Sequence, residues 1–191
     1  FIYSDDNKRY HTLNYYNKSS FNSKVFKAVI DAGFTCPNKD GTKGTGGCIY
    51  CMGGSGYFTE KSDGEIYDSV KRQLAAEKER IYNKHPDSLI TAYFQANTNT
   101  YAPVATLKEA YTAALDSEVH GISIGTRADC LSDDVIALLC DINSKIHLTV
   151  ELGLQTVHDK TAQIINRCYS YDEFLEGYRK LQESGIRTCL H

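Results

Sequence analysis

Three cysteines in one glycine-rich loop are the residues with the clearest chemistry in the sequence. Residues 36–51 read CPNKDGTKGTGGCIYC, so Cys36, Cys48 and Cys51 follow the spacing C-x11-C-x2-C. The C-x2-C half lets two thiolates reach one metal centre, and the glycines of the longer half let the backbone fold closely around a bulky group. The chain has seven cysteines, an odd number at irregular spacings, which fits metal binding better than a disulfide framework. The loop therefore predicts a metal site.

The spacing alone leaves the fourth ligand of that site open. A structural zinc is closed by four N or S ligands, and His11, Cys130 or Cys140 could supply the fourth. An electron-transfer iron–sulfur cluster also normally has four cysteine ligands, for which Cys130 is the candidate. With three ligands, a [4Fe-4S] cluster keeps one iron free to bind a substrate or cofactor. Cys140, Cys168 and Cys189 are interpreted as small apolar residues of the core.

The elements that must position these cysteines alternate between strands and helices. Apolar, β-branched runs predict strands, which cover 24–33, 89–95, 119–127 and 146–155, with a fifth beginning at Ile186. Helical periodicity predicts helices, which cover 65–82, 103–115, 132–142, 159–167 and 171–184. Apolar strands that alternate with helices are typical of a parallel sheet covered by helices. The predicted fold class is α/β, a β/α barrel or part of one.

Polar residues gather where the chemistry of such a barrel is found. In β/α barrels the active site lies on the loops at the carboxyl ends of the strands. Besides the cysteine loop, the segments 95–100, 126–130 and 151–156 fall there. The candidate site residues in or beside these segments are Gln95, Asn97, Ser123, Arg127, Glu151 and Gln155.

Length and charge limit the remaining possibilities. The chain has 191 residues and is expected to form one domain over 24–191, preceded by an N-terminal arm over 1–23. A net charge of -3 gives no overall attraction to nucleic acid or to an anionic membrane. No leader or membrane-spanning run is found, which predicts a cytoplasmic protein.

The arm has two interpretations. It mixes basic and aromatic residues, which could contact phosphates and stack on bases, or it is simply a solvated segment. The residues concerned, two of which lie just beyond the arm, are Lys8, Arg9, Lys18, Lys24 and Lys27, with Tyr3, Tyr10, Tyr15 and Tyr16.

The cysteine loop resembles that of the radical S-adenosylmethionine (SAM) superfamily, in which three cysteines after the first barrel strand hold a [4Fe-4S] cluster. The usual spacing there is C-x3-C-x2-C, so the longer first gap is a departure. Five segments along essentially the whole chain resemble the bacterial YhcC-type branch, which has a similarly expanded spacing and is related to the radical SAM domain of the Elongator catalytic subunit. These segments are RYHTLNYY (9–16), DAGFTCPNKDGTKGTGGCIYC (31–51), YFQANTNTYAPV (93–104), GISIGTRADCL (121–131) and VELGLQTVHDKTAQIINR (150–167).

The resemblance implies a fold and a set of cofactors. The superfamily core is a partial (β/α) TIM-like barrel of six strands, so this chain would be truncated after its fifth strand begins. Poor activity is expected for such a piece on its own. Cys36, Cys48 and Cys51 would hold the [4Fe-4S] cluster, whose open iron would bind SAM. A reductant such as flavodoxin or ferredoxin would supply electrons, and a modified wobble uridine in tRNA would be the substrate. Rival interpretations are a zinc-stabilised RNA-binding module and an iron–sulfur electron-transfer protein.

The resemblance also implies roles for single residues around SAM. The backbone of Tyr50 would meet the adenine. Gln95 and Asn97 would receive the methionine amino group, in place of the more usual glycine-glycine-glutamate pattern. Arg127 would pair with the SAM carboxylate and Glu151 would accept ribose hydroxyl groups. Ser123 and Gln155 are further candidates for contacts with SAM, and no residue is assigned to the catalytic step itself.

Overall fold

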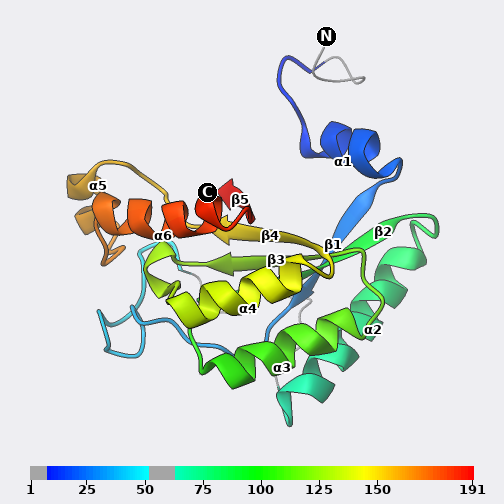
Figure 1. Ribbon diagram of the computed structural model, residues 1–191, viewed down its shortest axis with the longest axis horizontal. Coiled ribbons are helices and arrows are strands. Elements are labelled where there is room, and N and C mark those ends of the chain that lie inside the picture. The colour runs from blue at the N-terminus through cyan, green and yellow to red at the C-terminus, as the bar shows by residue number, and fades with distance from the viewer. Residues whose placement is uncertain (1–7, 52–62) are drawn as a thin grey trace.

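The computed structural model describes residues 8–51 and 63–191 of the chain. Tyr3 of the predicted arm lies outside these ranges. Five parallel strands form one sheet in the order of the chain, β1-β2-β3-β4-β5. Their bounds are β1 (Val25–Ile30), β2 (Leu89–Phe94), β3 (Gly121–Thr126), β4 (His147–Leu152) and β5 (Arg187–Leu190). The predicted α/β fold with a parallel sheet is thus confirmed, and a partial TIM-like barrel is consistent with it (Figure 1).

The helices connect the strands in the way that parallel pairing requires. They are α1 (Leu13–Phe21), α2 (Ile66–Tyr82), α3 (Val104–Leu115), α4 (Asp133–Asn143), α5 (Asp159–Ile164) and α6 (Tyr171–Glu183), with a 3-10 turn η1 (Ala128–Cys130). Helices α2, α3, α4 and α6 lie on one side of the sheet, and α1 lies on the opposite side (Figure 1). None of the helices in the described ranges is long and apolar enough to cross a membrane.

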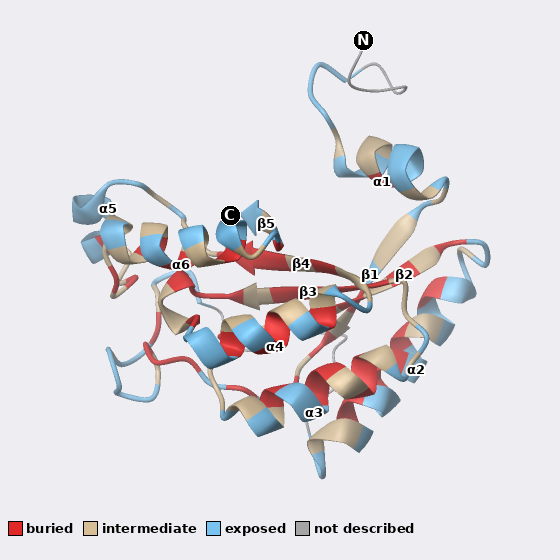
Figure 2. Cartoon of the chain, viewed as in Figure 1, coloured by how far each residue is buried: buried red, intermediate tan, exposed pale blue. Residues whose placement is uncertain are grey.

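The two faces of the sheet differ in chemistry because side chains alternate along each strand. Apolar side chains point to the helices and form the buried core, among them Ile30, Phe94, Ile124 and Val150. Figure 2 shows this burial along the strands and on the sides of the helices that face them. The opposite face, toward α1, carries polar side chains such as Thr91 and Glu151. We call this second face the polar face of the sheet.

One helix was not predicted from the sequence. The predicted arm contains helix α1, whose N-cap is Thr12: its Oγ1 accepts a hydrogen bond of 3.0 Å from Tyr15 N. Lys27 lies on β1, within the predicted strand 24–33, and its side chain belongs to the polar face. Residues 13–21 of the predicted arm therefore form a helix.

Helix α6 is fixed closely against the loop that follows β3. Ser170 and Glu173 form a capping box at its start: Ser170 Oγ accepts from Glu173 N at 3.1 Å, and Ser170 N donates to Glu173 Oε2 at 2.7 Å. Gly177 in the middle of α6 lies against η1, where an added Cβ would be 2.1 Å from Ala128 O. Only glycine permits this approach, which brings the end of β3 next to α6.

Candidate functional site

The cysteine loop follows β1 at the carboxyl end of the sheet. Cys36 is buried, Cys48 is half-buried, Cys51 is exposed, and all three are free thiols. Hydrogen bonds from Lys39 N to Cys36 O and from Cys51 N to Cys48 O, each of 2.8 Å, form tight turns beside the cysteines. Across residues 8–51 and 63–191, no three His, Cys, Asp or Glu side chains converge as ligands of a single metal ion.

Residues 165–170, between α5 and α6, hold the cysteine loop in place; we call them the 165–170 segment. Asn38 Nδ2 donates to Asn166 O at 2.5 Å, and Asn166 Nδ2 donates to Gly47 O at 2.8 Å. A third bond of 3.1 Å runs from Ile49 N to Ile165 O. The buried Asn38 amide also lies 3.5 Å from Cys48 Sγ, to which it donates. The loop is therefore positioned by residues more than one hundred places downstream.

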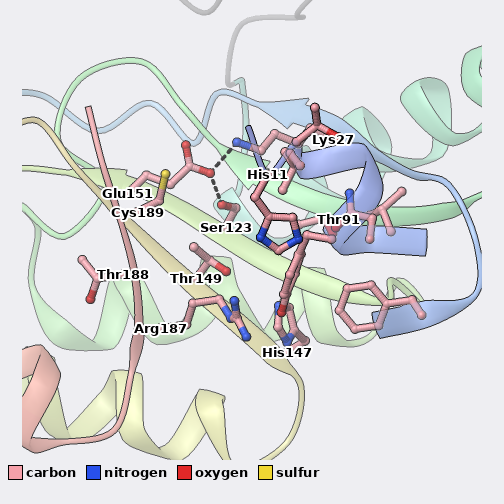
Figure 3. Close-up of a pocket in the computed structure, with 16 residues that line it drawn as sticks. His11, Lys27, Thr91, Ser123, His147, Thr149, Glu151, Arg187, Thr188 and Cys189 are labelled. Carbon is pink, nitrogen blue, oxygen red and sulfur yellow. Dashed lines mark hydrogen bonds and ion pairs between the residues drawn. The ribbon is translucent and has the colours of Figure 1, made fainter. Parts of the chain in front are cut away.

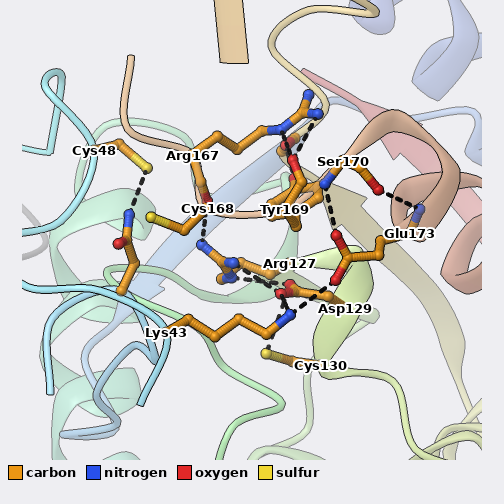
Figure 4. A network of polar contacts seen from close by, with 12 residues as sticks. Lys43, Cys48, Arg127, Asp129, Cys130, Arg167, Cys168, Tyr169, Ser170 and Glu173 are labelled. Carbon is orange, nitrogen blue, oxygen red and sulfur yellow. Dashed lines mark hydrogen bonds and ion pairs between the residues drawn. The ribbon is translucent and has the colours of Figure 1, made fainter. Parts of the chain in front are cut away.

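Arg127, at the end of β3, is the centre of a charged network. Its Nε and Nη2 donate to the two carboxylate oxygens of Asp129 at 2.9 and 2.8 Å. Lys43 of the cysteine loop lies 2.7 Å from Asp129 Oδ2 and 3.1 Å from Glu173 Oε1 (Figure 4). Burial by itself raises the pKa of Asp129, but hydrogen bonds from Arg127 and Lys43 outweigh it and hold that pKa below its usual value. Asp129 thus joins the cysteine loop to β3.

Two arginines enclose the ring of Tyr169. The guanidinium carbons of Arg127 and Arg167 lie 4.6 and 4.4 Å from its centre. Arg127 Nη1 also donates to Arg167 O at 2.9 Å. Arg167 is only 1% exposed, and its guanidinium satisfies three carbonyl oxygens, those of Leu154, Thr156 and Tyr169, at 2.6–3.1 Å. This stack connects the ends of β3 and β4 to the 165–170 segment.

Cys130 lies beside the same network. Its Sγ is 3.9 Å from Asp129 Oδ1. Burial, with the nearby charge of Asp129, raises the pKa of the Cys130 thiol to about 12. Cys130 is therefore protonated at neutral pH in this structure.

The predicted SAM contacts at the ends of β1 and β2 lie next to the cysteine loop. Tyr50 is half-exposed, and burial together with a hydrogen bond to Cys48 raises the pKa of its hydroxyl. Asn97 joins β2 to the loop, since its Nδ2 donates to Phe34 O at 2.8 Å and its Oδ1 accepts from Lys39 Nζ at 2.7 Å. Gln95 is exposed at the end of β2. These residues share one end of the sheet, as the sequence predicts.

Ser123 and Glu151 lie on the polar face of the sheet, where they line a pocket with Lys27. The pocket has a volume of about 380 Å³ and is covered by α1 (Figure 3). Lys27 Nζ and Ser123 Oγ both donate to Glu151 Oε1, and His191 Nε2 lies 2.9 Å from Oε2. Burial raises the pKa of Glu151, but the bonds from Lys27 and Ser123 outweigh it and lower that pKa below its usual value. We call this cavity the polar-face pocket.

The remaining predicted contact, Gln155, is separate from that pocket. It lies exposed beyond β4 with a φ of 62°, and its backbone N donates to His191 O at 2.6 Å. Sequence reasoning missed Asn38, Asn166, Asp129 and Tyr169 as parts of the site. Asn38 could have been singled out by its place inside the cysteine loop, whereas no sequence signal indicates that Asn166 reaches that loop.

Comparison with known proteins identifies the class. Residues 39–191 match the Radical SAM superfamily, and the chain therefore belongs to that superfamily. It is 48% identical over its whole length to the uncharacterized protein YtqA of Bacillus subtilis (strain 168) and 36% identical over 90% of its length to protein YhcC of Escherichia coli (strain K12). The uncharacterized protein MJ0486 of Methanocaldococcus jannaschii is 33% identical over 92% of the chain. The chain spans 59%, 54% and 53% of these three relatives.

A solved structure shows the same fold. The cobalamin-dependent SAM radical enzyme OxsB with aqua-cobalamin bound superimposes with a TM-score of 0.58, covering 85% of this chain and 23% of that protein at 11% identity. OxsB with aqua-cobalamin and SAM bound gives a TM-score of 0.57. Membership of the superfamily implies an enzyme that uses SAM and an iron–sulfur cluster, and the three free thiols of the cysteine loop are a donor set of the right chemistry.

Proposed function

We propose that the chain is the radical SAM domain of an enzyme that modifies the wobble uridine of tRNA, with Cys36, Cys48 and Cys51 as the ligands of a [4Fe-4S] cluster. The observation that carries the cluster assignment is the cysteine loop itself: three free thiols at the carboxyl end of a parallel sheet, where active sites of such folds lie. The amide of Asn38 beside Cys48 Sγ adds the kind of N–H donor that stabilises cluster sulfurs.

A cluster of this kind, with SAM, supplies one-electron cleavage of SAM and abstraction of hydrogen from the substrate. The chain's own residues would hold and orient SAM. Tyr50 would support the adenine, Gln95 and Asn97 the amino group, and Glu151 the ribose, with Ser123 and Gln155 as further contacts to SAM. The three nitrogens of Arg127 already donate to Asp129 and to Arg167 O, so a contact with the SAM carboxylate would replace one of these bonds.

The proposal also includes a tRNA substrate and an electron donor. The tRNA substrate is supported by the resemblance to the Elongator-related branch, and such an enzyme would work in the cytoplasm. A flavodoxin or ferredoxin would have access to the cysteine loop, because Ile49 and Tyr50 are 70% and 48% exposed and Cys51 is also exposed. This exposed part of the loop is where we expect the reductant to dock.

The cluster is tested by anaerobic reconstitution. We expect iron and acid-labile sulfide in a 4:4 ratio, as the [4Fe-4S] formula requires, and an electron paramagnetic resonance (EPR) signal of the reduced protein that SAM perturbs. Alanine at Cys36, Cys48 or Cys51 should abolish that signal, and the control Cys140→Ala, in α4 away from the loop, should retain it. Stoichiometric zinc, or a cluster whose signal SAM leaves unchanged, would contradict the proposal.

The substrate is tested separately in cells. Deleting the gene should change the nucleoside found at the wobble position of tRNA, as measured by mass spectrometry of digested tRNA. The full-length gene should restore the original nucleoside, and its Cys48→Ala variant should not. An unchanged set of wobble nucleosides in the deletion strain would refute the tRNA assignment and leave the cluster assignment intact.

A further inference from the structure

The polar-face pocket contains a positive charge that no carboxylate compensates. Among its described lining residues, Glu151 is the only carboxylate, and it already forms an ion pair with Lys27. These two charges cancel each other. Arg187, on β5, also lines the pocket, and across the described ranges no carboxylate or carbonyl oxygen accepts a hydrogen bond from its guanidinium. The pocket therefore keeps a net positive charge beside Arg187.

The contacts of Arg187 leave its hydrogen-bond donors available. Its guanidinium carbon lies 4.8 Å from the centre of the Tyr16 ring of α1. A cation–π contact uses the face of the guanidinium, whereas the N–H groups point outward along its edge. Tyr16 thus holds the arginine in the pocket without occupying its donors.

The neighbours of Arg187 are groups that complement an anion. His147 and Thr149 of β4 line the pocket beside it (Figure 3). Thr149 is the direct partner of Arg187 in the register of β4 and β5. Burial, followed by the nearby Arg187 charge, lowers the pKa of His147, so its neutral ring offers one N–H donor at pH 7. Hydroxyl, imidazole and guanidinium donors meet at one end of the cavity.

We propose that Arg187, His147 and Thr149 form a subsite that binds the phosphate or carboxylate group of a small ligand in the polar-face pocket. The planar guanidinium can donate two parallel hydrogen bonds to either anion. A volume of about 380 Å³ falls in the range of small-molecule sites, and a single nucleotide or a small organic acid matches that size. Its use as a substrate subsite rests on the proposed function, but the binding of an anion there does not.

The experiment is calorimetric titration of the reconstituted protein with two probes, inorganic phosphate and acetate. Binding of the preferred probe should weaken at least about tenfold in Arg187→Gln, the loss expected for a charge-assisted hydrogen bond. Arg179→Gln, which removes the same charge from the exposed side of α6, should bind as the unmodified protein does. Arg187→Lys keeps the positive charge but lacks the two parallel N–H donors of the guanidinium, and should give intermediate affinity. The probe bound more tightly identifies the anion.

The readout at the site is the ring signal of His147 in the nuclear magnetic resonance spectrum. It should move on addition of the probe in the unmodified protein and in Arg179→Gln, and stay in place in Arg187→Gln. Equal binding by all variants, or no binding of either probe, would overturn the inference. EPR spectra of the same samples separate the two proposals: a SAM-sensitive cluster without Arg187-dependent binding refutes the subsite alone, and the reverse result refutes the cluster assignment alone.

Discussion

The side-chain amide of Asn38 donates from Nδ2 to Cys48 Sγ over 3.5 Å, and Asn38 has no exposed surface. The same Nδ2 bonds to Asn166 O, so the amide cannot turn without breaking the link to the 165–170 segment. Its Oδ1 has no hydrogen-bond donor within the described ranges and faces Gly44, where an added Cβ would be 2.3 Å away. The orientation of the amide is therefore set by its surroundings, and its N–H group is aimed at the sulfur.

Asn38→Leu should shift the reduction potential of the proposed cluster to more negative values. An N–H donor to a ligand sulfur stabilises the reduced, more negative cluster, and leucine removes that donor at similar volume. EPR-monitored redox titration measures the midpoint, and iron content shows whether the cluster is retained. Asn14→Leu, on the exposed side of α1, is the control. A potential equal to that of the unmodified protein in a fully loaded variant would refute the role of Asn38.

Gly177→Ala should destabilise the protein although the residue lies inside a helix. Alanine normally favours a helix over glycine by about 1 kcal/mol. Here its Cβ would lie 2.1 Å from Ala128 O, which forces α6 and η1 apart at a cost of about 1–3 kcal/mol. Thermal unfolding measures the change. The control is Glu176→Ala, at the exposed neighbouring position of α6, which should change stability little. A stabilised Gly177→Ala variant would contradict the close approach.

Asp129→Asn should reduce the free energy of unfolding by about 3 kcal/mol at pH 7, because it leaves the buried Arg127 charge without its partner. The pKa of Asp129 is lower in the folded state than the usual aspartate value of about 3.9, so its contribution is present above that pH and is lost as the pH falls through the folded-state pKa. The difference in stability between the two proteins should therefore shrink below about pH 4.

Denaturant unfolding at several pH values measures that difference. Asp87→Asn, at an exposed position after α2, serves as the control and should show no such pH dependence. If the difference between Asp129→Asn and the unmodified protein stayed constant down to pH 2, Asp129 would not be the group that titrates.

Arg167→Met should destabilise the protein by at least about 3 kcal/mol, since it leaves three carbonyl oxygens without their donor in a region where the side chain is 1% exposed. Arg167→Lys should rescue this only in part, because an ammonium cannot reach all three oxygens as the planar guanidinium does. Chemical denaturation gives both values. Arg179→Met, on the exposed side of α6, is the matched control. Full rescue by lysine would show that charge alone is required.

The strands and most helices could be predicted because their signal is local. The predicted strand 89–95 became β2 (Leu89–Phe94), and the predicted helix 103–115 became α3 (Val104–Leu115). The first predicted strand, 24–33, ends earlier, at Ile30, since the residues after it turn toward the cysteine loop. Helix α1 has only a weak apolar pattern, and its one buried residue, Asn17, is polar, so periodicity could not indicate it.

The place of the cysteine loop in the fold could be predicted, whereas the contacts around the loop could not. Gly, Cys and the positions of strand ends are visible in the sequence, and they indicate the loop and the end of the sheet at which it lies. The partners of those residues are not visible, because Asn38 and Asn166, or Lys27 and Glu151, are more than 120 positions apart. Which polar residue meets which is decided by the packing of the sheet.

The bond between Asn38 and Asn166 has a consequence for the order of events in the cell. A ribosome makes about 5–20 residues per second, so the cysteine loop leaves it on the order of ten seconds before the 165–170 segment, 128 residues later, is available to hold it. During that interval the three thiols belong to a nascent chain without its mature loop geometry. For the proposed cluster, stable delivery of iron and sulfide to this loop would therefore be a late event of biogenesis, after synthesis of α5.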